Sequence, residues 1–189
     1  MNLFDNIRRV TPYVPGEQPA GEVIKLNTNE CPYAPSPRVP EAIASVGHSR
    51  LRLYPEPDCH TLKDALSAYY GISPKKVFVG VGSDDVLALA FLTFFAGRKP
   101  ILFPDITYSF YDVWAELYNI PYETVPLAED FTLRPEDYAR ENGGIIFANP
   151  NAPTGIALPL TGVEEILSSN PDSVVIVDEA YVDFGAATA

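Results

Sequence analysis

The sequence is poor in basic residues. It has 13 Lys and Arg against 25 Asp and Glu, which gives 189 residues a formal net charge of −12. No block of basic residues is interleaved with aromatic residues, as binding to a phosphate backbone would require. We therefore expect no nucleic-acid partner.

Cysteine and long apolar runs are also scarce. The two cysteines, Cys31 and Cys59, lie far apart and outside any C-x-x-C spacing, so we expect free thiols and no metal site. No apolar run approaches the roughly 18 residues of a membrane span, and no stretch resembles a signal peptide. We therefore expect a cytoplasmic protein that does not bind membranes.

Proline is plentiful but unevenly spread. Many of the 19 prolines precede residue 58, where they exclude long helices and continuous sheet. The sequence thus predicts an extended N-terminal arm over residues 1–57, with a short helix near Val39 to Val46. A more regular domain is expected over residues 58–189.

From about His60 onward, short apolar runs alternate with helical stretches of ten or so residues. That alternation indicates βαβ units and a mostly parallel sheet with helices on both faces, the three-layer α/β/α class. The expected strands are 76–82, 100–104, 122–127, 144–149 and 173–181. The expected helices are 61–71, 83–97, 109–119 and 160–170.

Ligands of such sheets bind at the carboxyl ends of the strands. At the first of these ends, Gly80 and Gly82 resemble the start of a dinucleotide fingerprint, but Asp85 stands where the third glycine belongs. Two interpretations remain. Ser83 and the first amides of the following helix bind one phosphate, or Ser83 is an ordinary N-cap.

Tyr108 lies between the expected strand 100–104 and the next helix. An aromatic ring at that corner can stack on a planar ligand ring. It can equally be one more packing residue, like Phe110, Tyr111 and Trp114.

The segment 149–155, "NPNAPTG", follows the expected strand 144–149. Its prolines, asparagines and glycine predict a stiff polar loop, either a structural turn or a preorganised ligand wall, and we favour the wall.

A buried strand is expected near the end of the sequence, at the apolar residues Val174 to Val177, with Asp178 at its tip. A carboxylate so close to a strongly apolar run is expected to seek a cationic or hydrogen-bond-donating partner, such as a protonated ring nitrogen. The alternative is an Asp that caps a helix or forms a salt bridge.

Together these motifs resemble the fold type I enzymes that use pyridoxal phosphate, the aspartate aminotransferase superfamily, and within it the histidinol-phosphate aminotransferases. The resemblance runs along the whole chain and rests on the order and spacing of several segments. These are "IKLNTNECPYAPSP", "RLYPEPDCH", "VGSDDVLALAF", "PDITYSFYDVWAEL", "NPNAPTG" and "IVDEAYVDF". It implies a homodimer that moves an amino group between glutamate and imidazole acetol phosphate, and thus acts on amino acids and oxo acids.

The resemblance also implies roles in binding pyridoxal phosphate. Ser83 and Asp84 match the positions that hold the cofactor phosphate, and Tyr108 matches the aromatic residue that stacks on the pyridine ring. Asp178 matches the acid that pairs with the ring nitrogen and keeps it protonated. Tyr181 matches a hydroxyl donor beside the phenolic oxygen of the ring.

Three residues of the arm receive roles from the resemblance as well. Tyr54 matches a tyrosine that reaches across a homodimer to the cofactor phosphate of the neighbouring subunit. Tyr13 and Asn29 lie where such enzymes place residues that contact the substrate.

Two features depart from the family pattern. Ala152 stands where many relatives have an asparagine that binds the phenolic oxygen, and Asn151, one residue earlier, is a candidate substitute. The family lysine that binds the cofactor covalently is also missing, because the lysines of this chain all lie outside the matching place. They are Lys25, Lys63, Lys75, Lys76 and Lys99. We therefore expect the N-terminal part of an aminotransferase, without the rest of its large domain and its small domain, and without activity by itself.

Other functions remain open. A threonine-phosphate decarboxylase or an aromatic aminotransferase would share most of these motifs. A non-catalytic module that binds pyridoxal phosphate or forms dimers is the alternative from another class.

Overall fold

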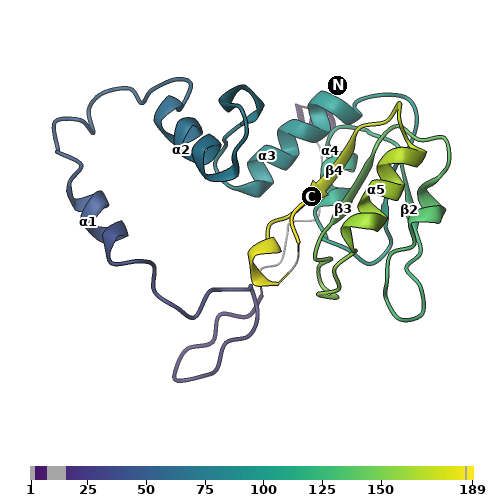
Figure 1. The fold of residues 1–189 in the computed structure, drawn as a ribbon, viewed down its shortest axis with the longest axis horizontal. Helices are drawn as coiled ribbons and strands as arrows, with labels where there is room; N and C mark the ends of the chain where they lie inside the picture. The colour runs from purple at the N-terminus through teal and green to yellow at the C-terminus, as the bar shows by residue number, and fades with distance from the viewer. Residues whose placement is uncertain (1–2, 8–15, 186) are drawn as a thin grey trace. The chain divides into compact units, whose positions relative to one another are not determined.

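A computed structural model describes residues 3–7, 16–185 and 187–189. The chain divides into two compact units, Met1–Asp58 and Cys59–Ala189, whose elements are labelled in Figure 1. Each unit is described by itself. Tyr13 lies outside the described residues.

The first unit has little regular structure. It contains the 3-10 helix η1 (Leu3–Asn6) and the α-helix α1 (Arg38–Ala44), which buries none of its residues. The helix expected near residues 39–46 is thus present. The remaining described backbone of this unit consists of turns, bends and segments without regular structure, and its many prolines disfavour long helices and continuous sheet.

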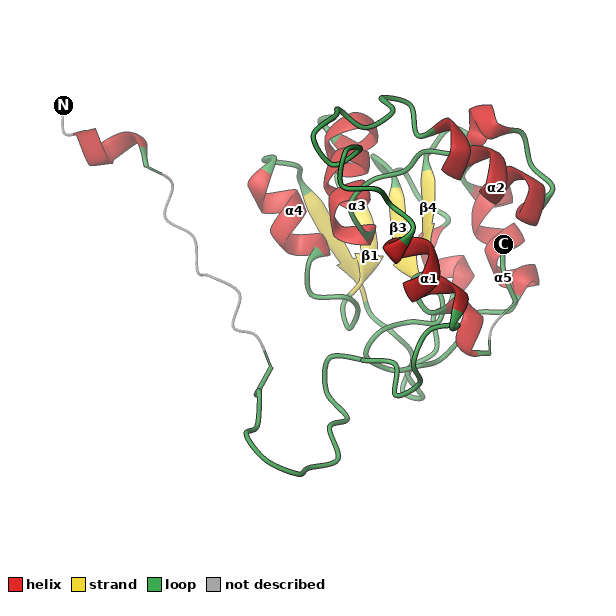
Figure 2. Cartoon of the chain, turned by 90° about the vertical axis from the view of Figure 1, so that its left-hand side faces the viewer, coloured by secondary structure: helices red, strands yellow, loops and turns green. Residues whose placement is uncertain are grey.

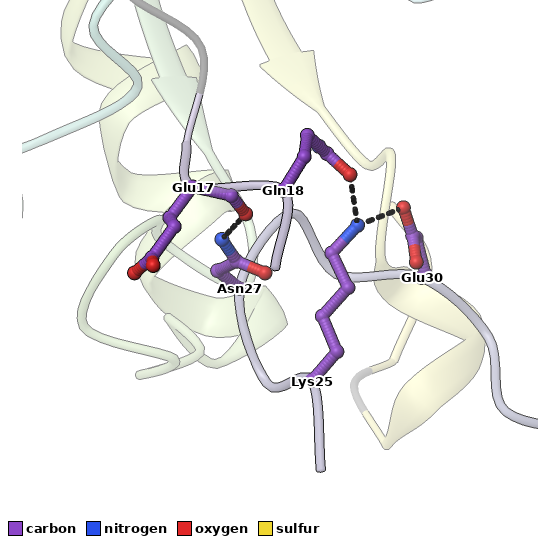
Figure 3. Close-up of polar contacts among 5 residues, drawn as sticks. All are labelled: Glu17, Gln18, Lys25, Asn27 and Glu30. Atoms are coloured by element: carbon purple, nitrogen blue, oxygen red, sulfur yellow. Dashed lines mark hydrogen bonds and ion pairs between the residues drawn. The ribbon is translucent and has the colours of Figure 1, made fainter. Parts of the chain in front are cut away.

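Polar contacts organise the segment 16–30 of the first unit (Figure 3). The Lys25 ammonium donates to Gln18 Oε1 at 3.1 Å and pairs with Glu30 Oε1 at 2.5 Å, while Asn27 Nδ2 donates to the carbonyl of Glu17 at 2.9 Å. These bonds close the segment into a loop. Asn29 lies within it, exposed, with a φ of +50°.

The second unit alternates helices with strands. Its α-helices are α2 (His60–Tyr70), α3 (Ser83–Ala90), α4 (Tyr111–Leu117) and α5 (Leu160–Ser169). Its strands are β1 (Ile101–Pro104), β2 (Tyr122–Val125), β3 (Ile145–Ala148) and β4 (Val175–Asp178). A π-helical turn, η3 (Phe91–Phe95), continues α3, and short 3-10 turns complete the unit: η2 (Pro74–Lys76), η4 (Pro135–Tyr138) and η5 (Val182–Phe184).

The four strands form one parallel sheet in the order β2-β1-β3-β4. Figure 2 shows β1, β3 and β4 side by side. Parallel strands need crossover connections, and the chain supplies α4 between β1 and β2 and α5 between β3 and β4. The expected parallel sheet is confirmed.

Apolar side chains cover both faces of the sheet, because successive residues of a strand point to opposite faces. Ile101 and Phe103 of β1 join a cluster with α3, η3 and α4, whereas Leu102 joins a second cluster with η4 and α5. In β3, Ile146 belongs to the first cluster and Ile145 and Phe147 to the second. Helices thus lie on both faces, which confirms the three-layer α/β/α class.

Two expectations about strands were wrong in detail. The expected strand 76–82 does not form. Lys76 belongs to η2, and residues 77–82 lie in no strand, although Val77 has an extended backbone; Phe78 and Val81 are exposed. An extended segment becomes a strand only beside a partner that completes its hydrogen bonds, and no described strand lies beside this one. β4 is half-buried rather than buried because it pairs with β3 alone and forms an edge of the sheet.

A buried amide network ties the start of β3 to the end of α5. Asn142 Nδ2 donates to Asn170 Oδ1 at 2.8 Å and Asn142 Oδ1 accepts from the Gly144 N–H at 3.0 Å. Asn170 Nδ2 in turn donates to the carbonyl of Ile166 at 2.8 Å. Both asparagines are buried, so loss of either side chain leaves buried polar groups without partners.

We expect Asn142→Ala to lower the free energy of unfolding by about 1–3 kcal/mol, the cost of leaving a buried donor and a buried acceptor unpaired. Urea denaturation measures this change. Glu141→Ala is the matched control, because Glu141 is exposed and its ion pair with Lys99 lies at the surface. Equal losses in the two variants would show that the network adds no stability of its own.

Candidate functional site

One cavity of the second unit lies at the ends of β3 and β4. β1, β3 and β4 run parallel, so Pro104, Ala148 and Asp178 lie at the same edge of the sheet. Beside Ala148 and Asp178 is a hollow that opens to solvent. Its lining consists of Ser83, Tyr108, Ala148, Pro150, Ala152, Asp178, Ala180 and Tyr181. Residues from four separate segments of sequence therefore meet in one place.

Helix α3 begins at this cavity. Gly82 is the N-cap, with a φ of +86° that favours glycine, and Ser83 is the first helical residue. The interpretation of Ser83 as an N-cap was therefore wrong. The N–H groups of the first helical turn have no partner within the helix, and the helix dipole makes this end attractive to an anion.

The two carboxylates at the start of α3 both have partners within the protein. Asp84 Oδ1 accepts from the Tyr108 hydroxyl at 2.8 Å, and Asp85 Oδ2 accepts from the Val81 N–H at 3.2 Å. Neither Asp84 nor Asp85 belongs to the cavity lining, whereas Ser83 does. The helix end can thus receive a phosphate although two acids follow in the sequence.

Tyr108 forms one wall of the cavity. Its ring stacks on Phe110, with centroids 5.6 Å apart, and meets the ring of Tyr111 edge to face at 5.7 Å. Burial, with help from the neighbouring Asp84 carboxylate, raises the pKa of Tyr108 above its usual range. Tyr108 is therefore a protonated donor that is packed on some sides and faces the cavity on another, so the two interpretations of this residue are compatible.

Asp178, at the tip of β4, lines the same cavity as Ser83 of α3. Its Oδ1 accepts from the Ala180 N–H at 3.2 Å, and its Oδ2 accepts from the Tyr111 hydroxyl at 2.9 Å. Burial, followed by the charge of Asp178, raises the pKa of Tyr111 far above its usual range. The phenol thus stays protonated and can only donate to this carboxylate.

Tyr111 is a site residue that sequence reasoning missed. The sequence predicts only a packing role for Tyr111, and its side chain is indeed fully buried. The pattern of α4 predicts burial of this position but says nothing about its hydroxyl. Only the packing of α4 against the sheet shows that the hydroxyl meets Asp178, 67 residues later in the sequence.

Tyr181 and Ala152 complete the cavity, and Asn151 does not belong to its lining. The Asn151 side chain is buried and ties its loop to the segment that follows β1. Its Oδ1 accepts from the Thr107 hydroxyl at 2.8 Å, and its Nδ2 donates to the Ile106 carbonyl at 2.9 Å and to Thr154 Oγ1 at 3.2 Å. Both donor hydrogens are thereby used, which argues against Asn151 as a substitute for the donor that Ala152 lacks.

The remaining candidate residues lie elsewhere. Asn29 and Tyr54 belong to the first unit, where Tyr54 is fully exposed, and Tyr13 lies outside the described residues. None of the lysines appears in the cavity lining. Both cysteines are free thiols, Cys31 being exposed and Cys59 half-buried. The described part of the chain contains no cluster of side chains suited to a metal ion.

Comparison with known proteins identifies the family. The family model described as "Aminotransferase class I and II" matches residues 21–189. The chain belongs to this aminotransferase family. Histidinol-phosphate aminotransferase 1 of Hydrogenovibrio crunogenus is 56% identical over 184 residues, which are 97% of this chain and 52% of that protein. The chain therefore spans about half the length of the relatives it matches.

Solved structures of aminotransferases and their relatives share the fold. Histidinol-phosphate aminotransferase from Sinorhizobium meliloti, solved in complex with pyridoxal-5'-phosphate, gives a TM-score of 0.72 at 24% identity, covering 82% of this chain and 44% of that one. L-threonine-O-3-phosphate decarboxylase from Porphyromonas gingivalis gives a TM-score of 0.58 at 24% identity, and the match covers 70% of this chain and 41% of that one. At these identities the likeness establishes the α/β fold of the family and not its activity.

Among the residues that the structure describes, no helix combines the length and the apolar character needed to cross a bilayer.

Proposed function

We propose that this chain forms the cofactor-binding part of a histidinol-phosphate aminotransferase. The observation that carries the proposal is the cavity that brings the start of α3, the ring of Tyr108 and the carboxylate of Asp178 together. Identity of 56% to a histidinol-phosphate aminotransferase, over almost the whole chain, supports the same assignment.

The residues around the cavity fit pyridoxal phosphate. The first turn of α3, at Ser83, suits the phosphate, and Tyr108 offers an aromatic face to the pyridine ring. Asp178 is acidic and has lone pairs left after accepting from Tyr111 and Ala180, so it suits a protonated ring nitrogen. When bound, the cofactor supplies an electron sink for the carbanion that forms when a substrate amine loses its α-proton.

Each of these side chains has a defined task in the proposed reaction. Asp178 holds a proton on the ring nitrogen, which keeps the ring electron-poor. Tyr108 limits the tilt of the ring, and the amides of α3 fix its phosphate end. Tyr181, which also lines the cavity, is the remaining hydroxyl that can donate to the phenolic oxygen, because Ala152 cannot.

The proposed substrates, assembly and location rest on the resemblance of the sequence to the histidinol-phosphate aminotransferases. We propose that the enzyme transfers an amino group from glutamate to imidazole acetol phosphate, by alternating use of one cofactor, and that it acts as a cytoplasmic homodimer. Residues 1–57 would contact substrate and the partner subunit, and residues 58–189 would hold the cofactor. The fully exposed Tyr54 is free to reach the cofactor phosphate of a second subunit, the role proposed for it.

We further propose that these 189 residues alone do not catalyse transamination. A lysine that binds the cofactor covalently must reach it, and none of the chain's lysines lines the cavity. The catalytic lysine would then come from sequence outside these residues.

A chimaera tests the proposed function. The matching N-terminal residues of the Hydrogenovibrio crunogenus relative are replaced by this chain, and the product is expressed in a bacterial strain that lacks histidinol-phosphate aminotransferase. We expect growth without histidine and glutamate-dependent turnover of imidazole acetol phosphate. The 189 residues alone should give neither.

The competing functions predict different outcomes of this experiment. A chimaera that folds and binds pyridoxal phosphate but turns over nothing would favour a non-catalytic module. Release of carbon dioxide from threonine phosphate would favour the decarboxylase, whose fold is shared. Turnover by the unextended chain would contradict the proposed need for a lysine from elsewhere.

A further inference from the structure

We propose that Tyr111 is a positioning residue that sets the acid and the aromatic wall of the cofactor cavity at a fixed spacing. This inference rests on the proposed function, because it concerns the same cavity. It assigns a role to a side chain that does not belong to the cavity lining and acts on the ligand through two residues that do.

Tyr111 contacts both Asp178 and Tyr108. Its hydroxyl donates to Asp178 Oδ2 at 2.9 Å, and its ring meets the ring of Tyr108 edge to face at 5.7 Å. Tyr111 is therefore the direct bridge between the residue proposed to bind the ring nitrogen and the residue proposed to stack on the ring.

The surroundings of Tyr111 hold it in one place. Its side chain is completely buried in the cluster formed by α3, η3, α4 and the sheet. It also packs on Phe91, with ring centroids 6.3 Å apart, and on Phe103 at 6.0 Å. A buried side chain in close packing has little freedom to change rotamer, so its hydroxyl holds the Asp178 carboxylate at a defined position.

The two bonds that Asp178 accepts orient its carboxylate plane. Tyr111 engages one oxygen and the Ala180 N–H engages the other. Each oxygen has one further lone pair, which remains available to a ligand cation. Without the Tyr111 hydroxyl, one oxygen loses its fixed donor and the carboxylate can rotate away from the ring nitrogen.

Binding of pyridoxal phosphate to the unextended chain tests this role, with the fluorescence of Trp114, the single tryptophan, as the signal. We expect Tyr111→Phe, which keeps the ring packing, to weaken binding about tenfold, the value of one hydrogen bond to a charged group. In an Asp178→Asn background, Tyr111→Phe should weaken the binding of pyridoxal phosphate by less than a further factor of about two, because Tyr111 acts on the ligand through Asp178.

An analogue in which C–H replaces the ring nitrogen separates positioning from general packing. It cannot pair with Asp178, so Tyr111→Phe should change its affinity less than about twofold. Tyr138→Phe is the matched control, since Tyr138 is also buried and its hydroxyl has no hydrogen-bond partner within the described residues. Loss of the Tyr138 hydroxyl should leave the affinity for pyridoxal phosphate unchanged.

The outcomes distinguish the two proposals. Saturable binding that Tyr111→Phe leaves unchanged, or an equal loss for the cofactor and the analogue in a folded variant, would overturn the positioning role alone. Failure of the unsubstituted chain to bind pyridoxal phosphate would overturn the proposed cofactor site and this inference with it. Circular dichroism shows whether each variant is folded.

Discussion

Asp178→Asn is expected to weaken binding of pyridoxal phosphate to this chain by at least about 30-fold, and to lower turnover of the chimaera by about 10²- to 10³-fold. The substitution keeps the shape of the side chain and removes its charge. The ring nitrogen would then lose the partner that keeps it protonated, so the electron sink would weaken even in the molecules that still bind the cofactor. Both binding and kcat should fall for this reason.

The size of this effect follows from where Asp178 lies. It is half-buried at the tip of β4, where its oxygens already accept from Tyr111 and Ala180, and water can screen the charge only in part. A charge pair formed in such surroundings is worth more than a pair at the surface. Fluorescence titration gives the affinity and steady-state kinetics give kcat.

Asp172→Asn is the matched control for this prediction. Asp172 is an exposed aspartate just before the other end of β4, so the substitution changes the net charge equally but far along the strand from the cavity. It should leave affinity and kcat unchanged. If Asp178→Asn bound the cofactor as tightly as the control, Asp178 would not be the partner of the ring nitrogen.

The order of helices and strands could be predicted from the sequence because it depends on local patterns of apolar and polar residues. Ile101 to Phe103 and Ile145 to Phe147 are continuous apolar runs, which predict strands covered on both faces. The segment 77–82 has a similar pattern and forms no strand. A pattern reports the tendency of a segment to be extended, whereas a strand also needs a neighbour, which the local sequence does not contain.

The candidate site was readable only in part. Strand ends could be located because each follows an apolar run, and this placed Tyr108 and Asp178 at one edge of the sheet. The direction of individual side chains could not be found in this way. Asn151 was a plausible ligand donor, yet its amide donates to Ile106 and Thr154. Tyr111 looked like a packing residue, yet its hydroxyl donates to Asp178. Both facts depend on contacts between residues far apart in sequence.

The second large effect concerns stability. We expect Phe91→Ala to lower the free energy of unfolding by about 3–5 kcal/mol, because it leaves a cavity in the core that the neighbouring rings cannot fill. Phe91 is completely buried and packs on Phe95 at 5.2 Å and on Tyr111 at 6.3 Å between ring centroids. Urea denaturation followed by circular dichroism measures the change.

Phe94→Ala provides the matched control, because Phe94 lies in the same π-helical turn but is 55% exposed. Phe94→Ala should lower the free energy of unfolding much less than Phe91→Ala, since most of the Phe94 surface already faces water. Where Phe91→Ala proves too unstable to purify, Phe91→Leu keeps most of the volume and should give an intermediate loss. Equal losses from Phe91→Ala and Phe94→Ala would mean that the cluster around Tyr111 is not the core of this unit.

Phe91→Ala should also affect the cofactor site. Phe91 supports Tyr111, and Tyr111 in turn contacts both Asp178 and Tyr108. A cavity in place of the Phe91 ring allows Tyr111 to move, so folded Phe91→Ala should bind pyridoxal phosphate more weakly than folded Phe94→Ala. Affinity measured without urea, under conditions where both variants are folded, separates this effect from the loss of stability. Equal affinities would show that the hydrogen bond to Asp178 holds Tyr111 in place without the support of Phe91.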